Sequence, residues 1–99
     1  MVMWVGALEF DLVLGDVHSL KEKRSVVRPI IADLAKRYPV SVAEVGHQNL
    51  HRRAHVGLAV VGGDRAHLVE VLDAIERRVA GRPEIELSST HRVLRTTED

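Results

Sequence analysis

The sequence predicts an α+β fold in which four antiparallel strands form one sheet and two helices lie on one face of it. Four segments alternate apolar and polar side chains with a period of two, and two segments repeat apolar side chains at helical spacing. These segments follow one another in the order β-α-β-β-α-β. Right-handed crossovers then favour the ferredoxin-like plait, with the first and third strands at the centre. The 99 residues suffice for a single domain spanning residues 1–99.

The first strand is expected over residues 2–14, where Leu8, Phe10 and Leu12 share one face. Gly15 ends this strand. A helix is expected to begin after Ser19, because Ser19-Leu20-Lys21-Glu22 forms a capping box, and to run to about Tyr38. Pro29 lacks a backbone N–H and is expected to kink this helix.

The second half of the chain continues with two strands, a helix and a final strand. The strands are expected over residues 40–46 and 54–61, joined by a polar hairpin connection over residues 47–53. Asp64 is a good N-cap for a second helix that ends at Gly81. The last strand is expected from about Glu84 to Arg95, and residues 96–99 are expected to be a frayed tail.

Composition excludes several kinds of protein. Fourteen Lys and Arg balance fourteen Asp and Glu, so the bulk charge favours no polyanionic partner and any basic site must be local. Cysteine is absent, which excludes disulfides, thiolate metal sites and cysteine nucleophiles within this chain. The sequence shows no signal peptide and no membrane-spanning run, so we expect a cytoplasmic protein without a membrane partner.

The predicted topology gathers basic side chains at one end of the sheet. Three connections meet there: the turn before the first helix, the hairpin, and the turn after the second helix. We call this end the basic pole and define it by Lys21, Lys23, Arg24, Arg52, Arg53 and Arg82, with Ser19 at the N-terminus of the first helix. The functional interpretation is a surface that binds the phosphates of RNA. The alternative is a solvated cluster offset by Asp16, Glu22 and Glu44.

The sheet face opposite the helices, here called the open face, is predicted to be half apolar. Such a patch suggests a partner, most simply a second copy of the chain that packs its own sheet against it. The alternative is a modest patch of small side chains left in water. The residues expected at this interface are Met3, Val5, Ala7, Ala43, Ala59, Val61 and Leu94.

No catalytic or metal site is predicted. His47, His51 and His55 recur every four residues, but this spacing crosses a hairpin and does not align three imidazoles on a helix. Glu9 and Asp11 point the same way on one strand, and with His55 they resemble a general acid/base pair. A polar sheet surface held by ion pairs is the favoured explanation of these carboxylates.

An enzyme of the acylphosphatase type is the alternative that the fold class brings with it. Such small plaits bind phosphate with their first loop and an arginine, while an asparagine holds water; Arg24 and Asn49 are available here. The turn over residues 14–19 does not match the loop of that family. No glycine-rich phosphate loop is present, and no cofactor is predicted.

Three segments together carry a resemblance to a known family. They are SLKEKR at residues 19–24, SVAEVG at residues 41–46, and the strand over residues 53–61 followed by the helix that Asp64 initiates. In these segments the chain resembles the YlxP-like family of small bacterial proteins, a domain of unknown function, over residues 2–95.

The resemblance implies a ferredoxin-like plait and no established activity or cofactor. Genes of the family often lie near those of transcription and translation factors, including a ribosome-binding factor, so it also implies a role linked to RNA or the ribosome. The leading hypothesis is a non-enzymatic, dimeric, cytoplasmic protein that binds RNA or a ribosomal subunit through the basic pole. The alternatives are an enzyme or sensor that binds a small anion at the same pole, and a protein-interaction module.

Overall fold

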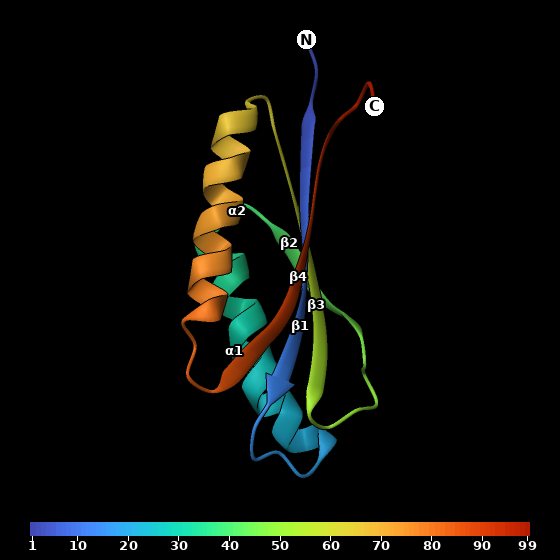
Figure 1. Ribbon diagram of the computed structural model, residues 1–99, viewed down its shortest axis with the longest axis vertical. Coiled ribbons are helices and arrows are strands. Elements are labelled where there is room, and N and C mark those ends of the chain that lie inside the picture. The colour runs from blue at the N-terminus through green and yellow to red at the C-terminus, as the bar shows by residue number, and fades with distance from the viewer.

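The computed structural model describes residues 1–99 and contains the six predicted elements in the predicted order (Figure 1). The strands are β1 (Trp4–Leu14), β2 (Ser41–Gly46), β3 (Arg53–Gly62) and β4 (Ile85–Thr96). The helices are α1 (Leu20–Arg37) and α2 (Arg65–Ala80). This arrangement confirms the ferredoxin-like plait.

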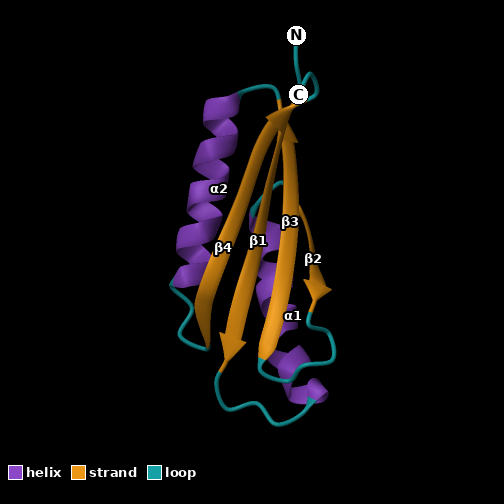
Figure 2. Cartoon of the chain, turned by 45° about the vertical axis from the view of Figure 1, so that its right-hand side comes forward, coloured by secondary structure: helices purple, strands orange, loops and turns teal.

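The sheet has the order β2-β3-β1-β4, and every neighbouring pair is antiparallel. Both helices cover the same face, while the other face is open (Figure 2). Alternate side chains of β1 and β3 point under the helices, and Leu8, Phe10 and Val56 are among those almost fully buried there. The period-two pattern of the two central strands therefore supplies the sheet side of the core.

Both predicted N-caps are present. The Ser19 hydroxyl accepts a hydrogen bond from the Glu22 N–H at 3.1 Å, and a Glu22 carboxylate oxygen accepts one from the His18 N–H at 2.9 Å. At α2, the Asp64 carboxylate accepts a hydrogen bond from the Ala66 N–H at 3.1 Å. These bonds satisfy amide donors that the first helical turn leaves without partners.

Helix α1 continues through Pro29 to Arg37. Pro29 removes one backbone hydrogen bond but is exposed, so its ring and the carbonyl that it frees lie on the solvent side. The expected interruption is therefore accommodated within one helix of 18 residues.

A bulge in β4 overturns one interface prediction. Asp11 pairs with Ser89 but Leu12 pairs with Leu87, so Ser88 is an extra residue and the alternation of β4 reverses beyond it. Leu94 therefore lies opposite Gly6 and packs against the core on the helix side, not on the open face. Val93, opposite Ala7, takes the place on the open face.

The same bulge turns Arg92 toward α2. Its guanidinium lies 2.9 Å from the Asp73 carboxylate and 3.3 Å from that of Glu76. Arg92 therefore ties the edge strand β4 to the helix above it.

The molecule is elongated, with extents of 49 × 22 × 21 Å. Both chain termini lie at one end, and the start of α1 and the β2–β3 hairpin lie at the other (Figure 1). Residues 97–99 are hydrogen-bonded rather than frayed: the Thr97 N–H donates to the Met3 carbonyl at 2.9 Å, and the Asp99 N–H donates to that of Thr96 at 3.2 Å.

Candidate nucleic-acid interface

The turn before α1 and the β2–β3 hairpin lie side by side at the end opposite the termini. The Leu14 N–H donates a 2.8 Å hydrogen bond to the Arg52 carbonyl, and the Arg52 Nε–H donates a 3.5 Å bond to the Val17 carbonyl. Between the two segments lies a cleft of about 530 Å³. Its lining comprises Val17, His18, Asn49, Leu50, His51, Arg52 and Arg53.

Two residues of the basic pole lie exposed on the first turns of α1 without an acidic partner. These are Lys21 and Arg24. Arg28, one turn beyond Arg24, is also exposed, and together with Ser25 and Pro29 the three cations line a shallow hollow of about 350 Å³. Their ammonium and guanidinium groups are free to meet an external anion.

Lys23 is buried, which removes its ammonium from the accessible surface of the basic pole. Its side chain is 2% exposed, and Nζ donates a 2.6 Å hydrogen bond to the His47 carbonyl. Nζ also lies 2.8 Å from a carboxylate oxygen of Glu44. Lys23 thereby fastens α1 to the end of β2, where His47 adopts a positive φ of 57°.

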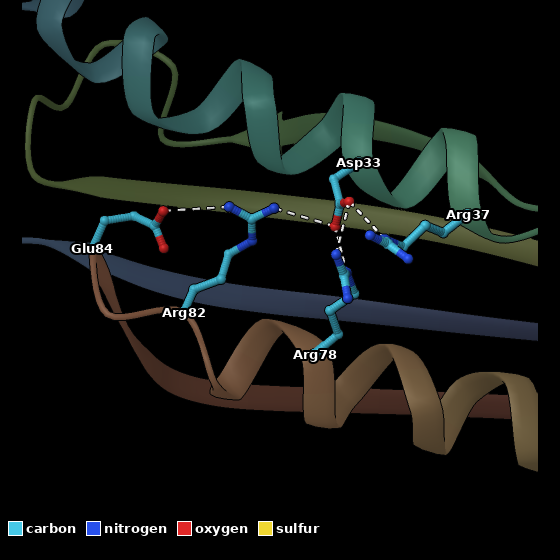
Figure 3. Close-up of polar contacts among 5 residues, drawn as sticks. All are labelled: Asp33, Arg37, Arg78, Arg82 and Glu84. Carbon is cyan, nitrogen blue, oxygen red and sulfur yellow. Dashed lines mark hydrogen bonds and ion pairs between the residues drawn. The ribbon is translucent and has the colours of Figure 1, made fainter.

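Arg82 is also engaged inside the fold. Its guanidinium lies 3.2 Å from Asp33 on α1 and 3.3 Å from Glu84 (Figure 3). Asp33 accepts further hydrogen bonds from Arg78 at 2.5 Å and from Arg37 at 2.9 Å. Arg82 was predicted to converge on the N-terminus of α1, but its guanidinium instead meets Asp33 in the C-terminal half of that helix, so Arg82 is not part of the exposed basic surface.

The contacts around Asp33 also alter its ionisation. Hydrogen bonding to Arg78, assisted by Arg37 and Arg82, holds the pKa of the Asp33 carboxyl well below its ordinary value, although burial acts in the opposite direction. The same contact raises the pKa of Arg78. The cluster is therefore a set of charged hydrogen bonds that joins α1 to α2.

Arg53 and Ser19 have partners of their own. The Arg53 guanidinium lies 3.6 Å from Asp11 on the open face, where the His47 imidazole lies 3.3 Å from the same carboxylate oxygen. The Ser19 hydroxyl is occupied by the cap of α1, and the Glu22 carboxylate beside it opposes an anion at this helix N-terminus. The structure therefore leaves Lys21, Arg24 and Arg52 as the cations of the basic pole that have no acidic partner.

The open face carries the residues predicted for an interface with a second copy of the chain, apart from Leu94. Val5, Ala7, Ala59 and Val61 lie in register on β1 and β3, and Met3 and Val61 are exposed. A shallow groove of about 400 Å³ crosses this face. Its lining comprises Ala7, Leu8, Glu9, Ser41, Val42, Ala43, Val45, Gly57, Leu58 and Ala59.

The candidate acid/base residues form ion pairs on the same face. The His55 imidazole lies 3.2 Å from the Glu9 carboxylate, and the His47 and His55 ring centres are 5.9 Å apart. No group of three or more His, Asp and Glu side chains is arranged to hold a metal ion. No helix has the length and apolarity needed to cross a membrane.

Comparison with known proteins decides the family. Residues 5–92 match the family described as "Protein of unknown function (DUF503)". The chain belongs to this family. It is 31% identical to "Uncharacterized protein YlxP" of Bacillus subtilis (strain 168) over 86 residues, which cover 87% of this chain and 94% of that protein. The resemblance stated from the sequence is thus confirmed for this DUF503 protein.

Among solved structures, the DUF503 chain is similar to a variant of SnoaB, a cofactor-independent oxygenase from Streptomyces nogalater. The TM-score is 0.46 and the identity 14%, over 98% of this chain and 94% of that one.

Sequence reasoning missed Arg28 as a member of the exposed basic surface. A signal was available, because Arg28 follows Arg24 by four residues and therefore lies above it on the same side of α1. A similar signal marked Lys23, which shares its helical face with Val27, Ile30 and Leu34. The partner of Arg82 had no such signal, because Asp33 is distant in sequence.

Proposed function

We propose that this DUF503 protein is a non-enzymatic RNA-binding protein that contacts RNA, or a ribosomal subunit, through the basic pole. The observation that carries the proposal is that Lys21, Arg24 and Arg52 are free of acidic partners in a chain whose net charge is zero. Phosphate groups are the ligands that such local concentrations of lysine and arginine attract. A cytoplasmic location follows from the proposal, because ribosomal subunits occur there.

The cleft beside Arg52 supports the same function. His51 and Asn49 line it with hydrogen-bonding groups, and Arg52 supplies a cation at the hairpin, whereas the His18 imidazole is engaged by the Asp16 carboxylate at 2.6 Å. Lys23 and Arg82 act differently, because they hold α1 to β2 and to α2. The contact surface is therefore the solvent side of α1 together with the hairpin.

The test is co-sedimentation with ribosomal subunits and a gel-shift assay with a structured RNA, at about 50 mM and about 200 mM salt. The Arg52→Gln variant is expected to bind more weakly, because it loses one cation. The control is Arg77→Gln, which removes an exposed arginine on α2, outside both the basic pole and the open face. Equal binding by wild type and the Arg52 variant would remove the hairpin from the interface.

The cleft also offers a small anion a site, so the assay needs a second arm. Inorganic phosphate, nucleotides and an acyl phosphate are tested for thermal stabilisation, since a ligand that binds only the native state raises the melting temperature. Stabilisation by one of these, without RNA binding, would replace the RNA proposal by a small-anion sensor or enzyme.

We also propose that two copies pair through their open faces. Val61 is 61% exposed, and Met3 is 44% exposed beside it. These residues, with Val5, Ala7, Ala43 and Ala59, offer an apolar surface that a second sheet would cover. Light scattering is expected to give twice the chain mass for wild type and the single mass for Val61→Asp, whereas a monomeric wild type at micromolar concentration contradicts the dimer.

A further inference from the structure

We infer that the RNA bound by the basic pole is a duplex, contacted through its phosphates along the solvent face of α1. This inference rests on the proposed function and specifies its partner. The residues that carry it are Lys21, Arg24 and Arg28, of which Arg28 extends the surface beyond the basic pole.

The three cations form a stripe along one side of a helix. Residues 21, 24 and 28 lie three and four positions apart, so their side chains share one side of α1 over two turns, a length of roughly 10 Å. All three are exposed, and none is paired with a carboxylate. The stripe therefore presents three cations in a row along the helix.

The acidic residues of α1 lie elsewhere. Glu22 and Asp33 are eleven residues apart, which places them on the same side of the helix. Asp33 meets Arg78 of α2, so this side faces α2, and Glu22 is held by the His18 N–H. No acidic side chain of α1 therefore interrupts the stripe.

Helix α2 does not offer an equivalent surface. Its exposed and half-exposed positions include Glu70, Asp73 and Glu76 beside Arg77. Although both helices cover the same sheet face, only α1 presents unpaired cations without neighbouring carboxylates. A polyanion would accordingly dock on the α1 side of the helical layer.

The exposed side of α1 that carries the stripe has no aromatic ring on which the bases of single-stranded RNA could stack. Phe10 is fully buried, and Tyr38 packs against the core at the far end of α1. Trp4 lies at the start of β1, and the Arg65 guanidinium lies 5.9 Å from its ring centre. Proteins that bind single strands stack bases on exposed aromatic rings, whereas duplex RNA is recognised by shape and phosphate contacts across its shallow minor groove.

The stripe is also held rigidly. The buried Lys23 ties α1 to the His47 carbonyl, and Asp33 ties it to α2. Because the backbone of α1 is fixed at both places, the spacing of the three positions from which the cations extend is fixed as well. Such a preorganised row matches the regular backbone of a duplex.

The experiment measures fluorescence anisotropy with a labelled 20-base-pair RNA duplex and with one of its strands, chosen to be unstructured. We expect the duplex to bind at least about ten-fold more tightly than the strand. In Arg28→Gln, the salt slope of duplex binding is expected to fall by about 0.9, the loss of one phosphate contact. The control is Arg77→Gln, which removes an exposed arginine from α2 and is expected to leave the slope unchanged.

The outcomes separate this inference from the proposed function. Equal or tighter binding of the single strand would overturn the duplex and leave RNA binding intact. An unchanged salt slope in Arg28→Gln would overturn the role of the stripe. If neither RNA binds at about 50 mM salt, both the inference and the proposed function are wrong.

Discussion

At the scale of single residues, lysines that look alike in sequence have opposite roles. Lys21 and Lys23 both belong to the SLKEKR segment, yet Lys21 is exposed and Lys23 is buried. Lys23 occupies a position of the apolar face of α1, and its ammonium reaches the His47 carbonyl and Glu44. A buried charge of this kind is stabilising only while both partners are present.

Replacing Lys23 by Ala is expected to lower the free energy of unfolding by about 2–4 kcal/mol, because Glu44 and the His47 carbonyl lose their partner and a cavity opens. The matched Lys21→Ala variant is expected to change it by less than about 0.5 kcal/mol, since that side chain is solvated. Urea denaturation of the two variants measures both values. Equal losses would show that the Lys23 contacts add no net stability.

At the scale of elements, a cluster of charged side chains joins the two helices. Asp33 on α1 holds Arg78 and Arg82 from the second helix and the turn after it. Because the pKa of Asp33 is lowered in the folded state, its ionised form favours folding at any pH above the ordinary aspartate value of about 3.9. This contribution is lost as the pH falls below that value toward the lowered pKa.

The Asp33→Asn variant is expected to be less stable than wild type at pH 7 and to lose less further stability between about pH 5 and pH 2. The slope of the unfolding free energy against pH is expected to differ between the two proteins by about one proton. This is the proton that the unfolded wild type binds at Asp33 and the folded wild type does not. Glu70→Gln, at an exposed acid without a partner, is the control and should retain the wild-type slope. If the stability of wild type and of Asp33→Asn changes with pH in parallel, the lowered pKa of Asp33 is contradicted.

The bulge in β4 makes a second prediction at this scale. Leu94 packs on the core and Val93 lies on the open face, so Leu94→Ala is expected to cost about 1–2 kcal/mol more than Val93→Ala. Both variants are compared by denaturation at low protein concentration, which keeps pairing between copies out of the comparison. A larger loss for Val93 would mean that β4 keeps an unbroken alternation.

The sequence predicted the elements well because alternation and caps are local signals. Ser19 and Asp64 identified the helix starts, and β1 and β3 were recognisable from their period of two. The bulge was not predictable, because Ser88-Ser89-Thr90 is polar throughout and gives no sign of which residue faces the core. The pairing of Arg82 with Asp33 was not predictable either, because it depends on how α1 and α2 pack.

At the scale of the whole molecule, a neutral chain separates its charges by pairing some and exposing others. Arg78, Arg82 and Arg92 are held by carboxylates within the helical layer and at its junction with β4. Lys21, Arg24 and Arg28 on α1 and Arg52 on the hairpin remain free of carboxylates. The start of α1 and the hairpin lie at the end opposite the termini, where we propose that RNA binds (Figure 1). Net charge alone therefore understates the attraction of this surface for a polyanion.

RNA binding by the basic pole is tested most sharply by the salt dependence of the affinity for a structured RNA, measured for wild type and for Lys21→Gln/Arg24→Gln/Arg52→Gln. The logarithm of the wild-type binding constant is expected to fall linearly with the logarithm of the salt concentration. In the triple variant, the magnitude of this slope is expected to be smaller by about three units. A circular dichroism spectrum and melting temperature equal to wild type would establish that the variant is folded. A wild type that binds no RNA, or a triple variant with an unchanged slope, would contradict the assignment of the basic pole to RNA.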